Sequence, residues 1–125
     1  MKICSKCKVN KTFSNFSKDI TKPDGRYPSC RSCRKKSEEN YYLKVKYNLS
    51  IEAYEGMVRS QNGVCAICKK FSLNGCRLVV DHDHISGRIR GLLCDNCNLA
   101  LGLFKDSLET LSSAFDYLEN KIKTY

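Results

Sequence analysis

The chain has 125 residues, of which nine are cysteine and 42% are hydrophobic, and its formal net charge is +9. This length allows one domain or two very small ones, with an apolar core that stabilises a fold only marginally, so we expect structural metal to contribute. No apolar run approaches the roughly 20 residues that a membrane-spanning helix needs, which argues against a membrane partner.

The positive charge is concentrated in one part of the chain. Residues 1–50 hold thirteen Lys and Arg against four Asp and Glu, whereas residues 51–125 hold nine of each. A basic segment beside a neutral one is typical of a polyanion-binding part joined to a part that does chemistry; a solvated surface that only keeps the chain soluble is the alternative. Because the basic segment also carries cysteine pairs, we favour nucleic acid as the partner.

Eight of the nine cysteines occur in pairs with the spacing Cys-x-x-Cys: Cys4/Cys7, Cys30/Cys33, Cys65/Cys68 and Cys94/Cys97. Disulfide frameworks rarely show this spacing, and the chain begins Met-Lys-Ile-Cys without an apolar signal segment. We therefore expect an intracellular, reducing location, with the paired cysteines as metal ligands. For Cys76, which lies outside the pairs, we expect burial as a small apolar residue.

Residues 1–48 are expected to form a basic zinc module that binds DNA. A short strand or hairpin should lie between the first two cysteine pairs, with a turn at the Pro-Asp-Gly sequence of residues 23–25. A polar helix is expected over about residues 31–47, and its basic side chains are candidates for phosphate contacts: Arg31, Arg34, Lys35, Lys36 and Lys44. Three tyrosines are interleaved with them and also fit packing against a neighbouring module: Tyr41, Tyr42 and Tyr47.

Residues 49–125 are expected to form the second domain. Serine at position 50 is a typical N-cap for a helix over residues 50–60. Strand-like composition over residues 77–80 and 89–93 flanks a Ser-Gly turn signal, and a helix follows over residues 94–103. The predicted order of this part is therefore strand, loop, strand, helix.

The last predicted helix begins at Asp106 or Ser107 and runs to about residue 123. Asp106 and Glu109 have a capping-box spacing, and apolar residues recur in the 3-4-3-4 pattern of an amphipathic helix. We expect the apolar face to pack on its own domain, with a dimer seam as the alternative.

Each group of four cysteines is a zinc signal. The pairs are separated by 22 residues in the first group and 25 in the second, so each site would clamp an inserted hairpin. For the first group, a different pairing of thiolates crossed between the modules is the alternative. For the second, two cysteines and two histidines form the alternative site: Cys65, Cys68, His82 and His84.

A dense polar cluster lies between the second two cysteine pairs. Both histidines of the chain occur in the sequence Asp81-His82-Asp83-His84, and Asn98 follows Cys97 directly. Phosphodiester hydrolysis needs a base for the attacking water, which histidine can be, and charge neutralisation, which a divalent cation on carboxylate and amide ligands can supply. Asp81 and His82 are neighbours at a strand end, so their side chains should point to opposite faces unless the strand bends there. Zinc bound at Cys97 would place Asn98 opposite Asp81.

Several segments resemble the phage recombination endonuclease VII family, a group of His-Me finger (ββα-metal, HNH-like) nucleases: Val79-Val80-Asp81-His82-Asp83-His84, Gly87, Arg90-Gly91-Leu92-Leu93-Cys94, Cys97-Asn98 and Leu101-Gly102. The resemblance is dense from Cys65 to about Phe104, and Leu49 to Gln61 and the last helix are also similar to the family. The N-terminal four-cysteine unit resembles an extension seen in many phage members. The implied fold is a small zinc-stabilised α+β protein, with a ββα-metal core, flanking helices and an N-terminal zinc-finger-like unit.

By motif position, the resemblance implies that His82 is the general base that activates water. Asp81 and Asn98 would hold one divalent ion, normally magnesium with manganese as a substitute, against the scissile phosphate. His84 would assist, either at the phosphate or beside the metal.

The resemblance also bears on the charged residues of the hairpin. Arg88 and Arg90 are candidates for phosphate contacts, and Arg90 has bracing of the hairpin as its alternative role. For Asp83 we expect only a solvated loop carboxylate.

The function implied by the resemblance is a magnesium-dependent DNA endonuclease that leaves a 5′ phosphate, acting on branched or junction DNA in the cytoplasm of a phage host. Sequence-guided nicking or homing cleavage of duplex DNA is the runner-up, and a non-catalytic two-zinc DNA-binding protein is the second class. Nothing in the sequence speaks for or against RNA. The chain ends soon after the last helix, so we expect a monomer or weak homodimer instead of the intertwined dimer of junction-resolving members.

Overall fold

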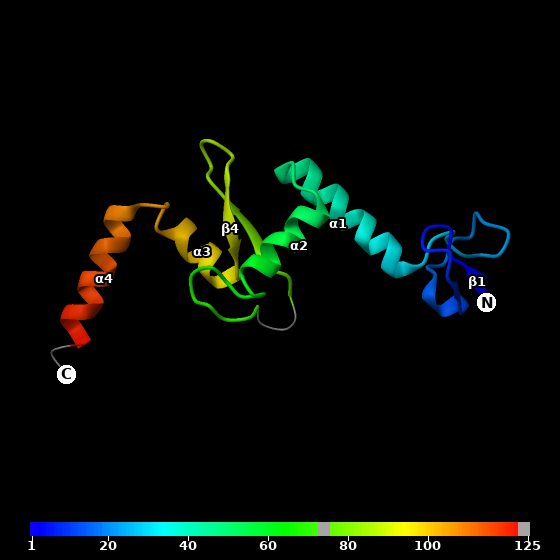
Figure 1. Ribbon diagram of the computed structural model, residues 1–125, viewed down its shortest axis with the longest axis horizontal. Helices are drawn as coiled ribbons and strands as arrows, with labels where there is room; N and C mark the ends of the chain where they lie inside the picture. The colour runs from blue at the N-terminus through cyan, green and yellow to red at the C-terminus, as the bar shows by residue number, and fades with distance from the viewer. Residues whose placement is uncertain (73–75, 123–125) are drawn as a thin grey trace. The chain divides into compact units, whose positions relative to one another are not determined.

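The computed structural model describes residues 1–72 and 76–122 (Figure 1). The chain divides into two compact units, Met1–Tyr54 and Glu55–Tyr125. The division falls inside helix α2 (Ile51–Ser60), shortly after the boundary that the composition suggests at residues 48 and 49.

The first unit is built around its cysteines. Strands β1 (Lys2–Ile3) and β2 (Asn10–Lys11) pair antiparallel, and a 3-10 turn, η1 (Phe13–Asn15), follows. The core consists of the fully buried Phe16 together with the first and third cysteines of the unit. The predicted turn is confirmed, since the amide of Gly25 donates to the carbonyl of Lys22 at 2.9 Å and Gly25 has a positive φ of 65°.

Helix α1 (Arg31–Tyr47) occupies the predicted basic segment. It begins directly after Cys30, whose extended backbone forms the N-cap, and it ends at Asn48, which adopts the left-handed conformation that closes many helices. Inside the same unit, the side-chain oxygen of Asn40 accepts a hydrogen bond from the amide of Ile51 at 3.2 Å. This contact links α1 to the first residue of α2, and the hydroxyl of Ser50 caps α2 through the amide of Ala53 at 3.1 Å, as predicted.

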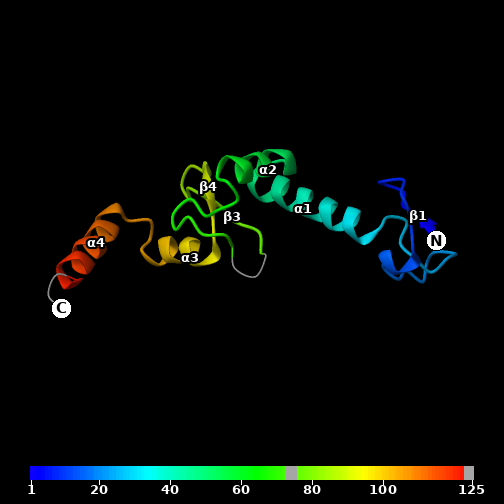
Figure 2. The same ribbon diagram turned by 60° about the horizontal axis from the view of Figure 1, so that its bottom comes forward.

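The second unit contains the predicted strand, loop, strand and helix. Strands β3 (Val79–His82) and β4 (Ile89–Leu93) pair antiparallel, and helix α3 (Asp95–Leu103) contacts both of them (Figure 2). The apolar core of this unit holds these buried side chains: Cys65, Leu78, Val80, Leu92 and Leu93. The small α+β fold with a ββα unit is confirmed, although β3 begins two residues later than the sequence predicts.

The side chain of Gln61 ties the end of α2 to β4. Its amide nitrogen donates to the carbonyls of Val64 and Leu92, both at 2.9 Å, and its oxygen accepts from the amide of Leu92 at 2.9 Å. The side chain of Gln61 thus makes the two hydrogen bonds with the backbone of Leu92 that a neighbouring strand would make. The next two residues, Asn62 and Gly63, have positive φ angles of 53° and 72° and turn the chain toward the cysteine loop.

Helix α4 (Leu108–Ile122) is present, but the capping box predicted for it is wrong. The N-cap is Ser107, whose hydroxyl accepts from the amide of Thr110 at 3.1 Å, because the carboxylate of Asp106 is engaged by an arginine of β4. The apolar face of α4 is not packed as expected, since Leu108 and Phe115 remain 83% and 66% exposed. Among the described helices, none is long and apolar enough to cross a membrane.

Candidate functional site

The second group of cysteines forms a site suited to a tetrahedral metal ion. Its four sulfur atoms lie within 4.8 Å of one another: Cys65, Cys68, Cys94 and Cys97. The sulfurs of Cys68 and Cys94 are 3.8 Å apart, and a tetrahedral zinc with Zn–S bonds of about 2.3 Å requires S–S edges of about 3.8 Å. In the described part of the chain, the alternative site with two cysteines and two histidines is therefore not formed.

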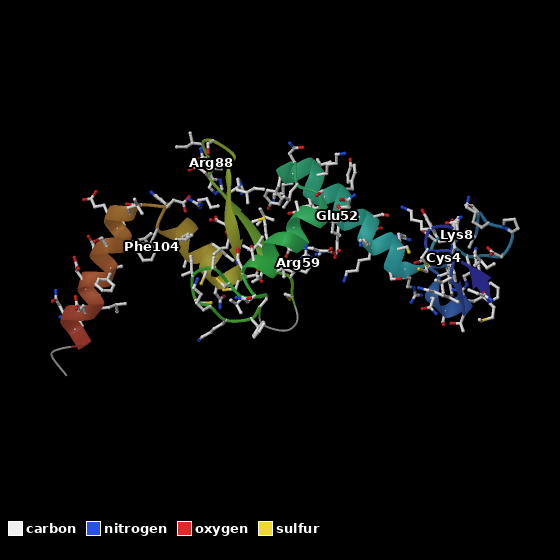
Figure 3. The ribbon with its side chains drawn as sticks, in the orientation of Figure 1. Cys4, Lys8, Glu52, Arg59, Arg88 and Phe104 are labelled. Atoms are coloured by element: carbon white, nitrogen blue, oxygen red, sulfur yellow. The ribbon has the colours of Figure 1, made fainter. Side chains whose placement is uncertain are left out.

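The first group has the same arrangement within the first unit. The sulfurs of Cys4, Cys7, Cys30 and Cys33 also lie within 4.8 Å of one another, so the crossed pairing between modules is not formed either. The amide of Cys30 donates to the sulfur of Cys4 at 3.2 Å, and the ammonium of Lys11 lies 3.4 Å from the sulfur of Cys30. Figure 3 labels Cys4 in this unit.

The pKa values of the thiols fit a site that requires a cation. Hydrogen bonds from the hydroxyl of Ser32 and the amide of Cys33 lower the pKa of Cys30 to about 5. Burial raises the pKa of Cys65, but backbone amides outweigh it and bring the value to about 6. Burial raises the pKa of Cys97 to about 12. Four thiolates at this spacing repel one another, so a soft divalent cation is needed for all of them to ionise.

Cys76 is exposed, so the prediction that it is buried is wrong. Together with Phe71 and three cysteines of the second group, it lines a cavity of about 460 Å³.

The pairing of β3 with β4 is irregular at the end of β3. Asp81 lies opposite Gly91 and His82 opposite Ile89, so Arg90 is the extra residue of a β-bulge. Asp81 is buried, with 7% of its surface exposed, whereas His82 is half-buried. The carboxylate and the imidazole therefore differ in their exposure to solvent, although they are neighbours in the sequence.

The two histidines lie side by side. The ring centroids of His82 and His84 are 4.8 Å apart and the rings are tilted by 48°. His84 is the more exposed of the two. A group that binds one ring is therefore within reach of the other.

Arg90 binds Asp81 through both arms of its guanidinium group. Its Nε donates to Asp81 Oδ2 at 2.7 Å and its Nη2 to Asp81 Oδ1 at 2.8 Å. The same Nη2 lies 3.3 Å from Oδ2 of Asp106, and these carboxylates raise the pKa of Arg90. Arg90 therefore connects β4 to β3 and to the turn after α3, a contact that fits the bracing role given as its alternative, while Asp106 is a residue for which only a helix cap was expected.

Asp83 organises the loop between β3 and β4. Its Oδ1 accepts from the amide of Ile85 at 2.9 Å, the amide of Ser86 at 2.6 Å and the hydroxyl of Ser86 at 3.0 Å. These hydrogen bonds, those from Ser86 above all, lower the pKa of Asp83. The loop closes at Gly87, whose φ is 71°. The carboxylate therefore has a structural role that the sequence did not reveal.

Asn98 lies in the first turns of α3, directly after a ligand of the second cysteine group. Its backbone amide donates to the backbone carbonyl of Cys94 at 3.0 Å, and its side chain is exposed. Carboxylate and amide oxygens are ligands that magnesium accepts, and magnesium usually keeps several waters. Asp81 and Asn98, on elements that contact each other, are a donor set of this kind. In the residues that the structure describes, clusters of three or more Cys, His, Asp or Glu ligands occur only as the two cysteine groups.

The predicted DNA-contact residues of α1 differ in their surroundings. Arg31, Lys35, Lys36 and Lys44 are exposed. Arg34 is instead half-buried; its Nε donates to Glu38 at 2.9 Å and its guanidinium lies 4.8 Å from the ring centre of Tyr27. On the hairpin, Arg88 is exposed in the loop between β3 and β4 (Figure 3).

Lys46 is one of the lysines interleaved with the tyrosines of α1. Its ammonium lies 5.3 Å from the ring centre of Tyr42 and 5.2 Å from that of Tyr47, and it donates to the hydroxyl of Tyr42 at 2.9 Å. The two tyrosines therefore hold a cation, and Tyr41 and Tyr42 are 72% and 52% exposed.

Known proteins resemble this chain over much of its length. The gene 59 protein of Mycobacterium phage D29 is 44% identical over 73 residues, which cover 58% of this chain and 44% of that protein. The gene 59 protein of Mycobacterium phage L5 is 35% identical over 91 residues, covering 72% and 56% respectively. The chain thus spans about half the length of these curated relatives.

A solved structure and a family model complete the comparison. The crystal structure of the ββα-Me type II restriction endonuclease Hpy99I aligns with a TM-score of 0.43 and 31% identity, covering 96% of this chain and 65% of that one. The family model for recombination endonuclease VII matches residues 40–120, which contain the bulge, both histidines, the second cysteine group and Asn98. The chain belongs to the recombination endonuclease VII family.

Proposed function

We propose that this protein is a DNA endonuclease that hydrolyses phosphodiester bonds with one magnesium ion and is held together by two structural zinc ions. The observation that carries the proposal is the bulged end of β3. There a buried carboxylate and a half-buried imidazole follow each other, in a unit that also holds a four-cysteine site and in a chain of the recombination endonuclease VII family.

His82 is the proposed general base. It would take the proton of the water that attacks the phosphorus, and the neighbouring ring of His84, 4.8 Å away, would contact the same phosphate. Asp81 and Asn98 would hold the magnesium ion, which supplies charge stabilisation at the phosphate and the leaving 3′ oxygen. The products would be a 5′ phosphate and a 3′ hydroxyl.

The two zinc sites would be structural. Four thiolates fill a tetrahedral zinc and leave no open position for water, which is typical of structural sites. In the second unit, Cys94 and Cys97 lie at the start of α3, so zinc would fix the turn that carries Asn98.

Residues 1–48 are proposed as the DNA-binding module. Their support is the excess of basic residues, with thirteen Lys and Arg in the first fifty positions, and the exposed side chains of Arg31, Lys35, Lys36 and Lys44. Branched or junction DNA is the substrate that the family suggests, and nicking of ordinary duplex is the alternative.

Incubation of the zinc-loaded protein with supercoiled plasmid tests the proposal. We expect nicked product with magnesium or manganese, none with EDTA, and none for Asp81→Asn, which removes the ligand charge. Parallel reactions with a four-way junction, linear duplex and RNA of matched length identify the substrate. Absence of cleavage of every substrate by a folded, zinc-loaded protein would sink the proposal.

A further inference from the structure

The carboxylate of Asp106 is connected to the proposed cation site through a single side chain. Arg90 donates two hydrogen bonds to Asp81, at 2.7 and 2.8 Å, and its Nη2 lies 3.3 Å from Asp106. Asp81 belongs to β3, Arg90 to β4, and Asp106 to the turn after α3. Three successive elements of the unit therefore meet at one guanidinium group.

The turn after α3 holds Asp106 in this position. Lys105 and Asp106 have positive φ angles of 53° and 54°, an uncommon conformation for residues other than glycine. The amide of Asp106 donates to the carbonyl of Leu101 at 3.0 Å, which folds the turn back on the helix. Because α3 begins at the second cysteine group, metal binding there also fixes the place of Asp106.

Arg90 leaves room on Asp81 for a cation. A carboxylate offers about four lone-pair sites, two on each oxygen. The guanidinium of Arg90 uses one on each oxygen, so the remaining ones are still available to an ion. Arg90 consequently orients the carboxylate instead of blocking it.

The charges explain why a second carboxylate is needed. Asp81 and Arg90 alone form a neutral pair, which attracts a divalent cation weakly. Asp106 makes the net charge of the three groups −1. The side chains of Arg90 and Asp106 are 34% and 29% exposed, so water screens this charge only in part.

We propose that Asp106 is a positioning residue for the divalent cation: through Arg90 it orients Asp81 and supplies the negative charge that the pair lacks. This inference rests on the proposed function, because it takes Asp81 as a metal ligand. In this proposal Asp106 acts only through Arg90 and is not itself a ligand of the ion.

Binding of Mn²⁺ to the zinc-loaded protein, followed by electron paramagnetic resonance without DNA, tests the proposal. The bound Mn²⁺ that is present in the wild type and absent in Asp81→Asn defines the site. Asp106→Asn keeps an oxygen for Arg90 but removes the charge, and we expect roughly tenfold weaker Mn²⁺ binding, at the low end for residues behind a metal ligand. Glu109→Gln, which removes the same charge from an exposed position in α4, is the matched control and should bind Mn²⁺ like the wild type.

Three further measurements distinguish the proposed positioning role of Asp106 from a purely structural role. Asp106→Asn should keep the zinc content and melting temperature of Glu109→Gln, and with saturating magnesium it should regain most of the wild-type cleavage rate. Asp106→Glu, which restores the charge, should recover Mn²⁺ affinity even if Asp106→Asn is poorly folded.

Three results would overturn the inference: equal Mn²⁺ affinity of Asp106→Asn and Glu109→Gln, no recovery in Asp106→Glu, or no wild-type signal that depends on Asp81. Mn²⁺ binding is measured without substrate, so the two proposals can fail separately. If the wild type cleaves no DNA, the proposed function is refuted. If Asp106→Asn nevertheless binds Mn²⁺ more weakly, the inference about Asp106 still holds.

Discussion

At the residue scale, the position of Arg90 as the extra residue of a bulge determines what its side chain does. In regular antiparallel pairing, successive side chains of β4 alternate between the two faces. The bulge opposite Asp81 and His82 breaks that alternation, which re-aims the side chain of Arg90. The guanidinium group consequently reaches the buried carboxylate of Asp81 with both of its arms. One irregularity in the ladder thus sets the direction of an acid that would bind metal.

Replacing Arg90 by lysine tests this geometry. Lysine keeps the charge but cannot form the forked pair, so one oxygen of the buried Asp81 loses its partner. We expect Arg90→Lys to lower the free energy of unfolding by about 1–2 kcal/mol, measured in urea. Arg88→Lys, at an exposed position of the neighbouring loop, is the control and should stay within about 0.5 kcal/mol of wild type. Equal stability of the two variants would show that the fork contributes nothing.

At the element scale, the secondary structure was predictable wherever local patterns determine it. The basic helix α1, the strand pair and α3 follow from periodicity, turn residues and the cysteine pairs, and the structure has them where expected. The two four-cysteine groups could also be predicted from the sequence, because the Cys-x-x-Cys spacing is typical of metal ligands.

The details that failed depend on contacts between distant residues. No local pattern indicates that Asp106 binds an arginine 16 positions earlier in place of capping α4, since the bulge that aims Arg90 has no signature in the sequence. Likewise, Cys76 has the type of a buried residue, but it is exposed and lines the cavity beside the second cysteine group. Composition predicts which residues can be buried, whereas topology decides which are.

At the scale of the whole molecule, charge and chemistry occupy different parts of the chain. The first fifty residues carry a net charge of +9, and the remaining residues are neutral. The unit with the bulge holds the proposed catalytic residues, and the unit with α1 holds most of the basic side chains proposed to bind DNA. Affinity for DNA and turnover should therefore respond to different substitutions.

Salt dependence of DNA binding tests this division. Removing one contact between a basic side chain and a phosphate reduces the slope of log K against log salt by about 0.9. We expect Lys35→Gln to weaken binding and to reduce the slope by about that amount, while cleavage at saturating protein stays unchanged. Lys121→Gln, in the neutral unit, removes the same charge and should leave the slope unaltered. A slope that changes equally in both variants would contradict a DNA-binding role for α1.

The role proposed for His82 is to activate the attacking water. Its most direct test is the single-turnover rate of DNA cleavage at saturating magnesium for wild type and His82→Ala, with the zinc content of both proteins matched. A general base contributes roughly 100- to 10,000-fold, so we predict a decrease of that size with DNA affinity unchanged. A His82→Ala protein that cleaves as fast as wild type would contradict the claim.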